Sequence, residues 1–175
     1  MEKLIIALTR SGYLIESDEK KTFNMSIFKN RLFYQKLIFL LNEVSNELNY
    51  NYNWYRRGPY SPDLTKDLFY IDELWNQNRS FIDMINKKNA YDKSVDNTIT
   101  SINKLKSSFE KDFKREWDAN DLEVLASLLF IDRHTYSKCR NSKTNTIEEL
   151  MERKPELKDQ SIDNYWDVLE SSKFI

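Results

Sequence analysis

The chain contains few of the residues on which several classes of protein depend. Its 175 residues include one cysteine, one histidine, two glycines and three prolines. The single cysteine, Cys139, cannot form an intrachain disulfide, and one histidine without a Cys-x-x-Cys pair is too little for a zinc site. Two glycines cannot build the glycine-rich loop that cradles a phosphate. These shortages predict a cytoplasmic protein with no metal, no cofactor and no nucleotide hydrolysis.

The chain also lacks long apolar runs and a large net charge. The N-terminal apolar run from Leu4 to Leu8 is soon followed by Arg10, and it is too short for a signal peptide or a membrane span. Lysine and arginine number 27 against 28 acidic residues, so no overall field attracts nucleic acid or an anionic membrane. We therefore expect no membrane partner, and any basic site must be local.

Apolar residues make up 40% of the chain and aromatic residues 14%, which is enough for one globular domain over residues 1–175. Their spacing is mostly helical, and it is clearest at Phe33, Leu37, Leu41 and Val44. The sequence predicts a mainly α fold with a small β-sheet. Further helices are expected near residues 4–12, 62–75 and 95–116, from a cap formed by Asn120 and Glu123, and after Ser161.

The most informative stretch combines a strand, a turn and a helix start. Aromatic and amide side chains alternate from Tyr50 to Trp54, which is the two-residue period of a half-buried strand. Gly58 and Pro59 then break this strand. Ser61 followed by Pro62 is typical of an N-cap and the first position of a helix. We expect that helix to run from residue 62 to about residue 75.

Residues 79–92 show a weaker pattern. Apolar residues between Phe81 and Ile85 are followed by the polar tetrapeptide Asn86-Lys87-Lys88-Asn89. A polar tip of this kind after a short apolar run predicts a β-hairpin.

Candidate catalytic and metal-binding groups each have a simpler interpretation. His134 follows an apolar helix, where the helix dipole favours a terminal histidine without any catalytic role. Cys139 lies between Lys138 and Arg140 in an expected exposed loop, yet a bystander thiol is the stronger interpretation. Asp63 and Asp67 are four residues apart but have no third ligand nearby. We expect no enzymatic activity.

Two features near the turn allow binding. Arg56 and Arg57 directly precede a helix N-terminus, where a phosphate or an acidic partner could dock. Alternatively, one arginine pairs with Asp63 or Asp67 while the other covers an aromatic ring. The aromatic strand face could stack unpaired bases, although packing against the core is the favoured alternative.

The segments Arg31-Leu-Phe-Tyr-Gln-Lys-Leu-Ile-Phe-Leu-Leu41 and Tyr55-Arg-Arg-Gly-Pro-Tyr-Ser-Pro-Asp-Leu64 are the most distinctive in the chain. They resemble the YwgA-type winged-helix proteins of bacteria and archaea, which are distantly similar to the Panacea antitoxin domain. The Gln35-Lys36 pair and the Gly-Pro-Tyr-Ser turn carry most of this resemblance. It implies a winged-helix-like core at about residues 26–92 and a helical C-terminal part at about 95–175.

The resemblance also implies binding to double-stranded DNA, or recognition of a protein partner as an adaptor or an antitoxin-like module. In the winged-helix arrangement, helix 62–75 would enter the DNA groove and the hairpin 79–92 would be the wing. The expected DNA-contacting residues are Arg56, Arg57, Tyr60, Thr65, Lys66, Arg79, Lys87 and Lys88.

One feature opposes DNA binding, because helix 62–75 carries four acids against one lysine, a net charge of −3. A winged-helix scaffold that binds a protein partner explains this acidic helix with fewer assumptions. The sequence leaves both hypotheses open, DNA binding and binding of a protein partner. A homodimer is a further expectation, in which the long aromatic-rich helix near residues 95–117 would supply a symmetric contact.

Overall fold

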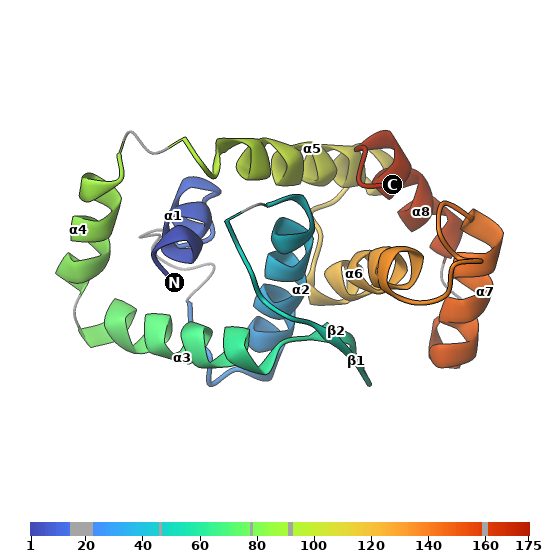
Figure 1. Ribbon diagram of the computed structural model, residues 1–175, viewed down its shortest axis with the longest axis horizontal. Coiled ribbons are helices and arrows are strands. Elements are labelled where there is room, and N and C mark those ends of the chain that lie inside the picture. Colours follow the sequence, from blue (N-terminus) through green and yellow to red (C-terminus); the bar gives the residue numbers. More distant parts are fainter. Residues whose placement is uncertain (15–22, 46, 78, 91–92, 159–160) are drawn as a thin grey trace.

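The computed structural model describes residues 1–14, 23–45, 47–77, 79–90, 93–158 and 161–175, without the side chain of residue 79. Within them lie eight α-helices, one 3-10 turn and one two-stranded sheet, which confirms the mainly α class with a small β-sheet (Figure 1). The elements are α1 (Glu2–Arg10), α2 (Phe28–Val44), β1 (Asn53–Tyr55), β2 (Gly58–Tyr60), α3 (Pro62–Gln77), α4 (Arg79–Lys88), α5 (Asp96–Phe113), α6 (Ala119–His134), α7 (Lys143–Arg153), the 3-10 turn η1 (Pro155–Leu157) and α8 (Ile162–Ser171).

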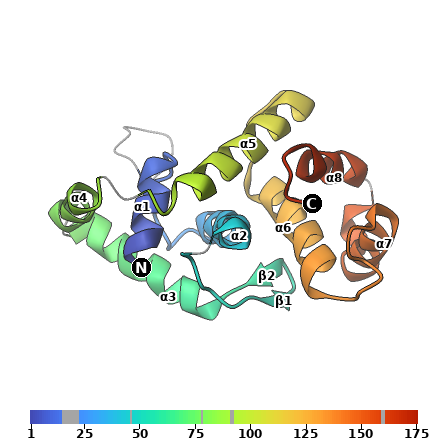
Figure 2. The ribbon, with the colours of Figure 1, turned by 45° about the horizontal axis from the view of Figure 1, so that its top comes forward.

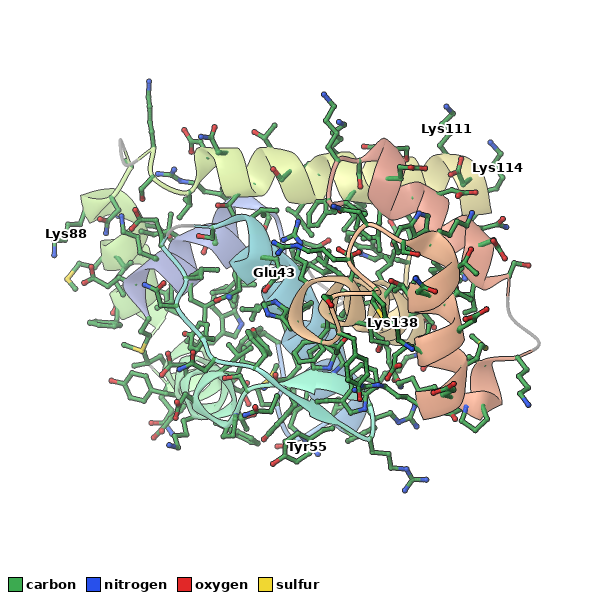
Figure 3. All side chains as sticks on the ribbon, turned by 45° about the vertical axis from the view of Figure 1, so that its right-hand side comes forward. Glu43, Tyr55, Lys88, Lys111, Lys114 and Lys138 are labelled. Atoms are coloured by element: carbon green, nitrogen blue, oxygen red, sulfur yellow. The ribbon has the colours of Figure 1, made fainter. Side chains whose placement is uncertain are left out.

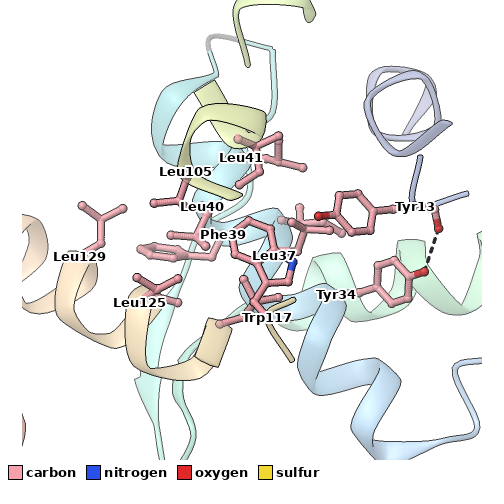
Figure 4. Packing of buried hydrophobic residues seen from close by; sticks show 14 of the residues in the cluster. Tyr13, Tyr34, Leu37, Phe39, Leu40, Leu41, Leu105, Trp117, Leu125 and Leu129 are labelled. Carbon is pink, nitrogen blue, oxygen red and sulfur yellow. Dashed lines mark hydrogen bonds between the residues drawn. The ribbon is translucent and has the colours of Figure 1, made fainter. Parts of the chain in front are cut away.

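Helices α2 and α6 form the centre of the core, as the apolar spacing of α2 predicted. Residues Leu37 to Leu41 of α2 are completely buried. They pack against α5 and α6, where Leu105, Leu125 and Leu129 are equally buried (Figure 4). A helix that is apolar on every side must be surrounded by protein. The sequence therefore places the apolar parts of α2 and α6 inside the molecule, where other helices cover them.

The strand, turn and helix start form a β-hairpin followed by α3. Strands β1 and β2 pair antiparallel, with Tyr55 opposite Gly58, so the turn consists of Arg56 and Arg57. Helix α3 begins at Pro62, as expected, and the hydroxyl oxygen of Ser61 accepts the backbone N–H of Leu64 at 3.3 Å. The second strand was not predicted from the sequence, because Gly58 and Pro59 were interpreted as breaking the strand.

The hairpin expected at residues 79–92 is wrong, since residues 79–88 form helix α4. Ile82 and Ile85 are three residues apart and both buried, which is the spacing of a helix face rather than a strand. The polar segment is the last helical turn, where Lys87 and Lys88 suit the negative end of the helix dipole. A helix therefore replaces the expected wing, and residues 91 and 92 lie outside the described residues.

The N-terminus of α6 is capped two residues earlier than the sequence predicted. Asp118, rather than Asn120, is the N-cap, and its carboxylate accepts the backbone N–H groups of residues 120 and 121 at 2.7 and 3.1 Å. Asp121 completes the capping box by accepting the backbone N–H of Asp118 at 2.7 Å. The expected partner, Glu123, is instead buried beside α7.

Replacing Asp118 with alanine should lower the free energy of unfolding by about 1 kcal/mol, because two N–H groups lose their acceptor. Asn120→Ala, at the position that the sequence suggested as the cap, should change stability by less than about 0.5 kcal/mol. Urea denaturation of both variants measures the difference. Equal losses in the two variants would contradict the observed cap.

A single cluster of buried apolar side chains extends from Leu4 in α1 to Phe174 after α8. The expected core at about 26–92 and the C-terminal part at about 95–175 both contribute to this cluster, and α5 contacts helices of both parts. Within the described part of the chain, none of the helices combines the length and the apolar character needed to cross a membrane.

Candidate binding groove beside the hairpin

A cavity of about 410 Å³ opens between the start of α2, the β-hairpin and the first half of α3. Its lining is Met25, then Phe28, Arg31, Leu32, Gln35 and Lys36 of α2, Tyr55, Arg56, Arg57, Gly58 and Tyr60 of the hairpin, and Thr65, Leu68 and Phe69 of α3. We call this cavity the hairpin groove. Both ribbon views place the hairpin between the start of α3 and α6 (Figures 1 and 2), and strand β2 contacts α2 and α6.

The walls of the groove are apolar and partly exposed. Phe28, Tyr55 and Phe69 are 57%, 54% and 44% exposed, respectively, although each is a large aromatic side chain. Leu32 and Leu68 are buried at the base of the groove. Exposed apolar side chains gathered around one concave site are typical of an interaction surface.

Charged side chains of only one sign line the groove. Arg31, Lys36, Arg56 and Arg57 belong to the lining, and no described carboxylate does. Arg57 forms a salt bridge with Glu123 at 3.2 Å. Across the residues that the structure describes, neither Arg31 nor Arg56 has a carboxylate within 4.0 Å. The groove is therefore locally cationic in a chain whose basic and acidic residues almost balance.

Arg31 is held in place although it has no acidic partner. Its guanidinium donates to the carbonyl oxygens of Met25 and Ser26 at 2.6 and 2.9 Å. It also lies over the ring of Phe28, at 5.7 Å from the ring centroid. These contacts fix the guanidinium, a group suited to carboxylates and phosphates, next to an exposed aromatic ring.

Lys36 lies beneath the groove and is 1% exposed. Its ammonium donates to the carbonyl oxygen of Pro59 at 2.5 Å. Burial lowers the pKa of Lys36 to about 7, the carboxylate of Glu123 opposes this shift, and the cations Lys154 and Arg57 add to it. Glu123 itself forms salt bridges with both Lys154 and Arg57. This buried network ties the hairpin to α2, α6 and the end of α7.

The Gln35-Lys36 pair is in direct contact with the Gly-Pro-Tyr-Ser segment, which is strand β2 followed by Ser61 rather than the expected turn. The side-chain amide of Gln35 donates to the carbonyl oxygen of Ser61 at 2.9 Å and accepts the backbone N–H of Ser61 at 3.1 Å. It also donates to the hydroxyl of Thr65 at 2.8 Å. Gln35 and Lys36 therefore hold the segment from which α3 begins.

The structure brings together four of the eight residues predicted to bind DNA. Arg56, Arg57, Tyr60 and Thr65 all line the groove. Thr65 donates its hydroxyl proton to the Tyr60 hydroxyl at 2.9 Å, so these two residues form one side of it.

The other predicted site residues lie elsewhere. Lys66 forms a salt bridge with Asp63 at 3.0 Å on the exposed face of α3. Lys87 and Lys88 are at the end of α4, and Lys88 approaches Glu2 of α1 at 3.9 Å. Figure 3 places Tyr55 and Lys88 on separate sides of the molecule. Arg79 begins α4, and its side chain lies outside the described residues.

The acids of α3 have structural partners. Asp67 accepts the Tyr50 hydroxyl proton at 2.6 Å, and Asp72 accepts the backbone N–H of Met25 at 2.9 Å. These contacts join α3 to the segments before α2 and before β1. The alternative in which Arg56 or Arg57 pairs with Asp63 or Asp67 is wrong, because Arg57 pairs with Glu123 on α6 and Arg56 has no described carboxylate within 4.0 Å.

The aromatic strand face packs inside the protein, as the favoured interpretation had it. The Trp54 ring lies 5.8 Å from that of Phe130, and the Arg153 guanidinium lies over it at 4.9 Å from the centroid. The Tyr52 ring meets Phe39 edge-on, with 5.0 Å between the centroids. This face is occupied by α2, α6 and α7 and does not present a stacking surface for bases.

The remaining candidate groups are also placed by the structure. His134 is at the C-terminal end of α6, with Nε2 3.0 Å from a carboxylate oxygen of Glu43. Burial tends to raise the pKa of Glu43, but His134 and Arg133 more than offset this and lower it. Cys139 is fully buried, so the expectation of an exposed thiol is wrong. Among the described residues, no three potential metal ligands lie close enough together to bind an ion.

Sequence reasoning missed the aromatic walls of the groove. Phe28 lies at the very start of α2, and Phe69 lies outside the buried stripe of α3 formed by Leu64, Leu68 and Ile71. An apolar residue outside its helix's buried stripe was the available signal. One such residue is common on any surface, and only the fold shows that these two face one cavity.

Comparisons with protein-family models, with curated proteins and with solved structures found no match to this chain. The similarity to the YwgA-type family therefore stays a prediction from its two sequence motifs.

Proposed function

We propose that this protein is a non-catalytic interaction module that binds a segment of another protein in the hairpin groove. The observation that carries the proposal is the open cavity of about 410 Å³ with Phe28, Tyr55 and Phe69 exposed around it. Cavities of this size with mainly apolar walls and a few polar groups are typical binding sites. Burying the three aromatic side chains against a partner would supply most of the affinity.

The scaffold of the groove supports this proposal. Gln35 and Lys36 fix strand β2 and Ser61 through hydrogen bonds, and Glu123 holds the hairpin to α6 through Arg57. A binding site that is already formed loses little conformational entropy when a partner docks. The hairpin groove is therefore suited to binding a short segment without rearrangement.

Double-stranded DNA, the other expected partner, accounts for fewer of these features. Proteins gain affinity for DNA mainly by placing lysine and arginine against phosphates. Helix α3 offers Lys66 alone, already paired with Asp63, and Lys87 and Lys88 belong to the end of α4 and not to the lining of the groove. Apolar walls contribute little beside a phosphate backbone. DNA binding is therefore the alternative that the experiment must exclude.

The proposal is tested by selecting binders from a library of random dodecapeptides displayed on phage, with the full-length protein immobilised. We expect enriched peptides that bind the protein and lose affinity by about tenfold or more when Phe28 and Phe69 are both replaced by serine. Both side chains are exposed, so the double variant should keep its fold, which thermal melting checks. Tyr136→Ser is the matched control, because Tyr136 is 56% exposed and lies outside the groove.

Two results would contradict the proposal. One is the absence of enriched peptides, or peptides that bind the double variant as well as the unaltered protein. The other is saturable binding of duplex DNA at physiological salt that Arg56→Glu abolishes, because affinity of that kind depends on cations at the turn.

A further inference from the structure

The charges of the hairpin groove indicate what kind of partner segment fits it. Arg31 and Arg56 line the groove and have no described carboxylate within 4.0 Å, while Arg57 pairs with Glu123. The chain as a whole has 27 basic and 28 acidic residues, so this grouping of cations is a local feature. Such a site attracts negative charge over short distances, within about 10 Å at ordinary ionic strength.

Docking against the groove would remove water from these cations. A guanidinium that loses its water without gaining a partner is costly, whereas one that meets a carboxylate gains charge-assisted hydrogen bonds. A purely apolar segment would bury the aromatic walls and leave Arg31 and Arg56 without an acidic partner. A basic segment would add repulsion to that cost.

We propose that the bound segment is amphipathic and acidic, with apolar side chains filling the hairpin groove and an aspartate or glutamate meeting Arg31 and Arg56. This inference rests on the proposed function, because it specifies the chemistry of the protein partner that the groove takes. Arg31 is the fixed contact, since two backbone carbonyls hold its guanidinium next to Phe28. Arg56, in the turn of the hairpin, is the exposed contact.

The acidic side chain of the partner would lie at the rim of the groove and not at its base. Leu32 and Leu68 form the base with Lys36 buried beneath, so the cavity itself accepts apolar groups. Around it, the exposed rings of Phe28, Tyr55 and Phe69 would exclude water from the ion pair. An ion pair that is shielded in this way contributes more than one fully exposed to solvent.

The test uses the enriched dodecapeptides made synthetically in three matched forms, with the acidic residue, with its amide, and with lysine. Fluorescence anisotropy with the full-length protein at physiological salt gives the dissociation constants. We expect the selected sequences to be rich in aspartate or glutamate next to large apolar residues. The amide form should bind about fivefold more weakly and the lysine form more weakly still.

A charge exchange locates the contact on the protein. Arg56→Glu should weaken binding of the acidic peptide by about tenfold and improve binding of the lysine form. Lys66→Glu is the control, because it makes the same change in net charge at an exposed position outside the groove. It should change the affinity by less than about twofold at physiological salt.

The outcomes separate this inference from the proposed function. Peptides that depend on Phe28 and Phe69 but bind equally in all three charge forms would overturn the inference and leave the function intact. Acidic peptides that respond to Lys66→Glu as strongly as to Arg56→Glu would overturn it as well, because they would be attracted by net charge alone. Peptides indifferent to Phe28 and Phe69 would overturn both.

Discussion

Replacing Gly58 with alanine should lower the free energy of unfolding by about 2–4 kcal/mol, from backbone strain of about 1 kcal/mol and a steric clash of about 1–3 kcal/mol. Gly58 has φ of +79°, a conformation that residues with a Cβ atom avoid. A Cβ atom there would also lie 2.4 Å from the hydroxyl oxygen of Ser127 on α6. Chemical denaturation of the variant measures the loss.

Two further variants separate the two causes. Gly12→Ala is the matched control, because Gly12 has φ of +76° but nothing within 4 Å of its Cβ position, so it should lose only about 1 kcal/mol. Ser127→Ala removes the clashing hydroxyl, which is buried and has no hydrogen-bond partner among the described residues. The double variant Gly58→Ala, Ser127→Ala should therefore recover most of the clash component. Equal losses for Gly58→Ala and Gly12→Ala would show that the hairpin does not pack closely on α6.

Replacing Lys36 with methionine should raise the free energy of unfolding at neutral pH by roughly 1–3 kcal/mol, because it removes a buried charge while keeping the volume of the side chain. Burial lowers the pKa of Lys36 from 10.5 to about 7, which corresponds to on the order of 4 kcal/mol of destabilisation when both states are protonated. Loss of the hydrogen bond to the Pro59 carbonyl offsets about 1 kcal/mol of the gain.

The effect of Lys36 also depends on pH in a defined direction. Between pH 7 and pH 10 the unfolded chain keeps the Lys36 proton that the folded protein has released, so this group makes stability rise with pH. The methionine variant should lack that rise, and its advantage should shrink as pH increases from about 7 to 9.5. Denaturation curves over this range test the prediction. The buried tyrosines, whose pKa burial raises, are the same in both proteins, so their contribution cancels in the difference between the variant and the unaltered protein.

The matched control is Lys87→Met, because Lys87 is an exposed lysine at the end of α4. It should leave both the stability and its pH dependence nearly unchanged. A loss of stability in Lys36→Met that persists at every pH would mean that the ammonium is a net stabiliser of the hairpin. In that case the charged network around Lys36, rather than apolar packing, would stabilise the position of the hairpin.

Most helices were predictable because their apolar residues repeat at helical spacing. The core helix α2 and the start of α3 at Pro62 follow from apolar period and from capping chemistry, which act over a few residues. Helix α4 was assigned incorrectly because its apolar residues are few and a polar tetrapeptide follows them. The Asp118 cap of α6 was missed because two capping patterns overlap in the sequence. Asp118 with Asp121 and Asn120 with Glu123 have the same spacing, and the structure shows that the first pair forms the cap.

The candidate site was only partly predictable, for a different physical reason. The sequence predicts a chain reversal at Gly58 and Pro59, whereas the turn consists of Arg56 and Arg57 and Gly58 begins strand β2. That Gln35 binds Ser61 is a contact across 26 residues of sequence, which no local pattern encodes. The exposure of Phe28 and Phe69 likewise depends on how α2 and α3 pack, so the groove appears only in three dimensions.

Backbone amide NMR of the labelled full-length protein, titrated in turn with a selected acidic peptide and with duplex DNA, shows directly which of the two the hairpin groove binds. We expect saturable peptide-induced shifts in residues 28–36, 55–60 and 65–69, and no saturable shifts with DNA at physiological salt. Peptide shifts centred on the end of α4 at Lys87 and Lys88, or saturable DNA shifts at the hairpin turn, would contradict this expectation.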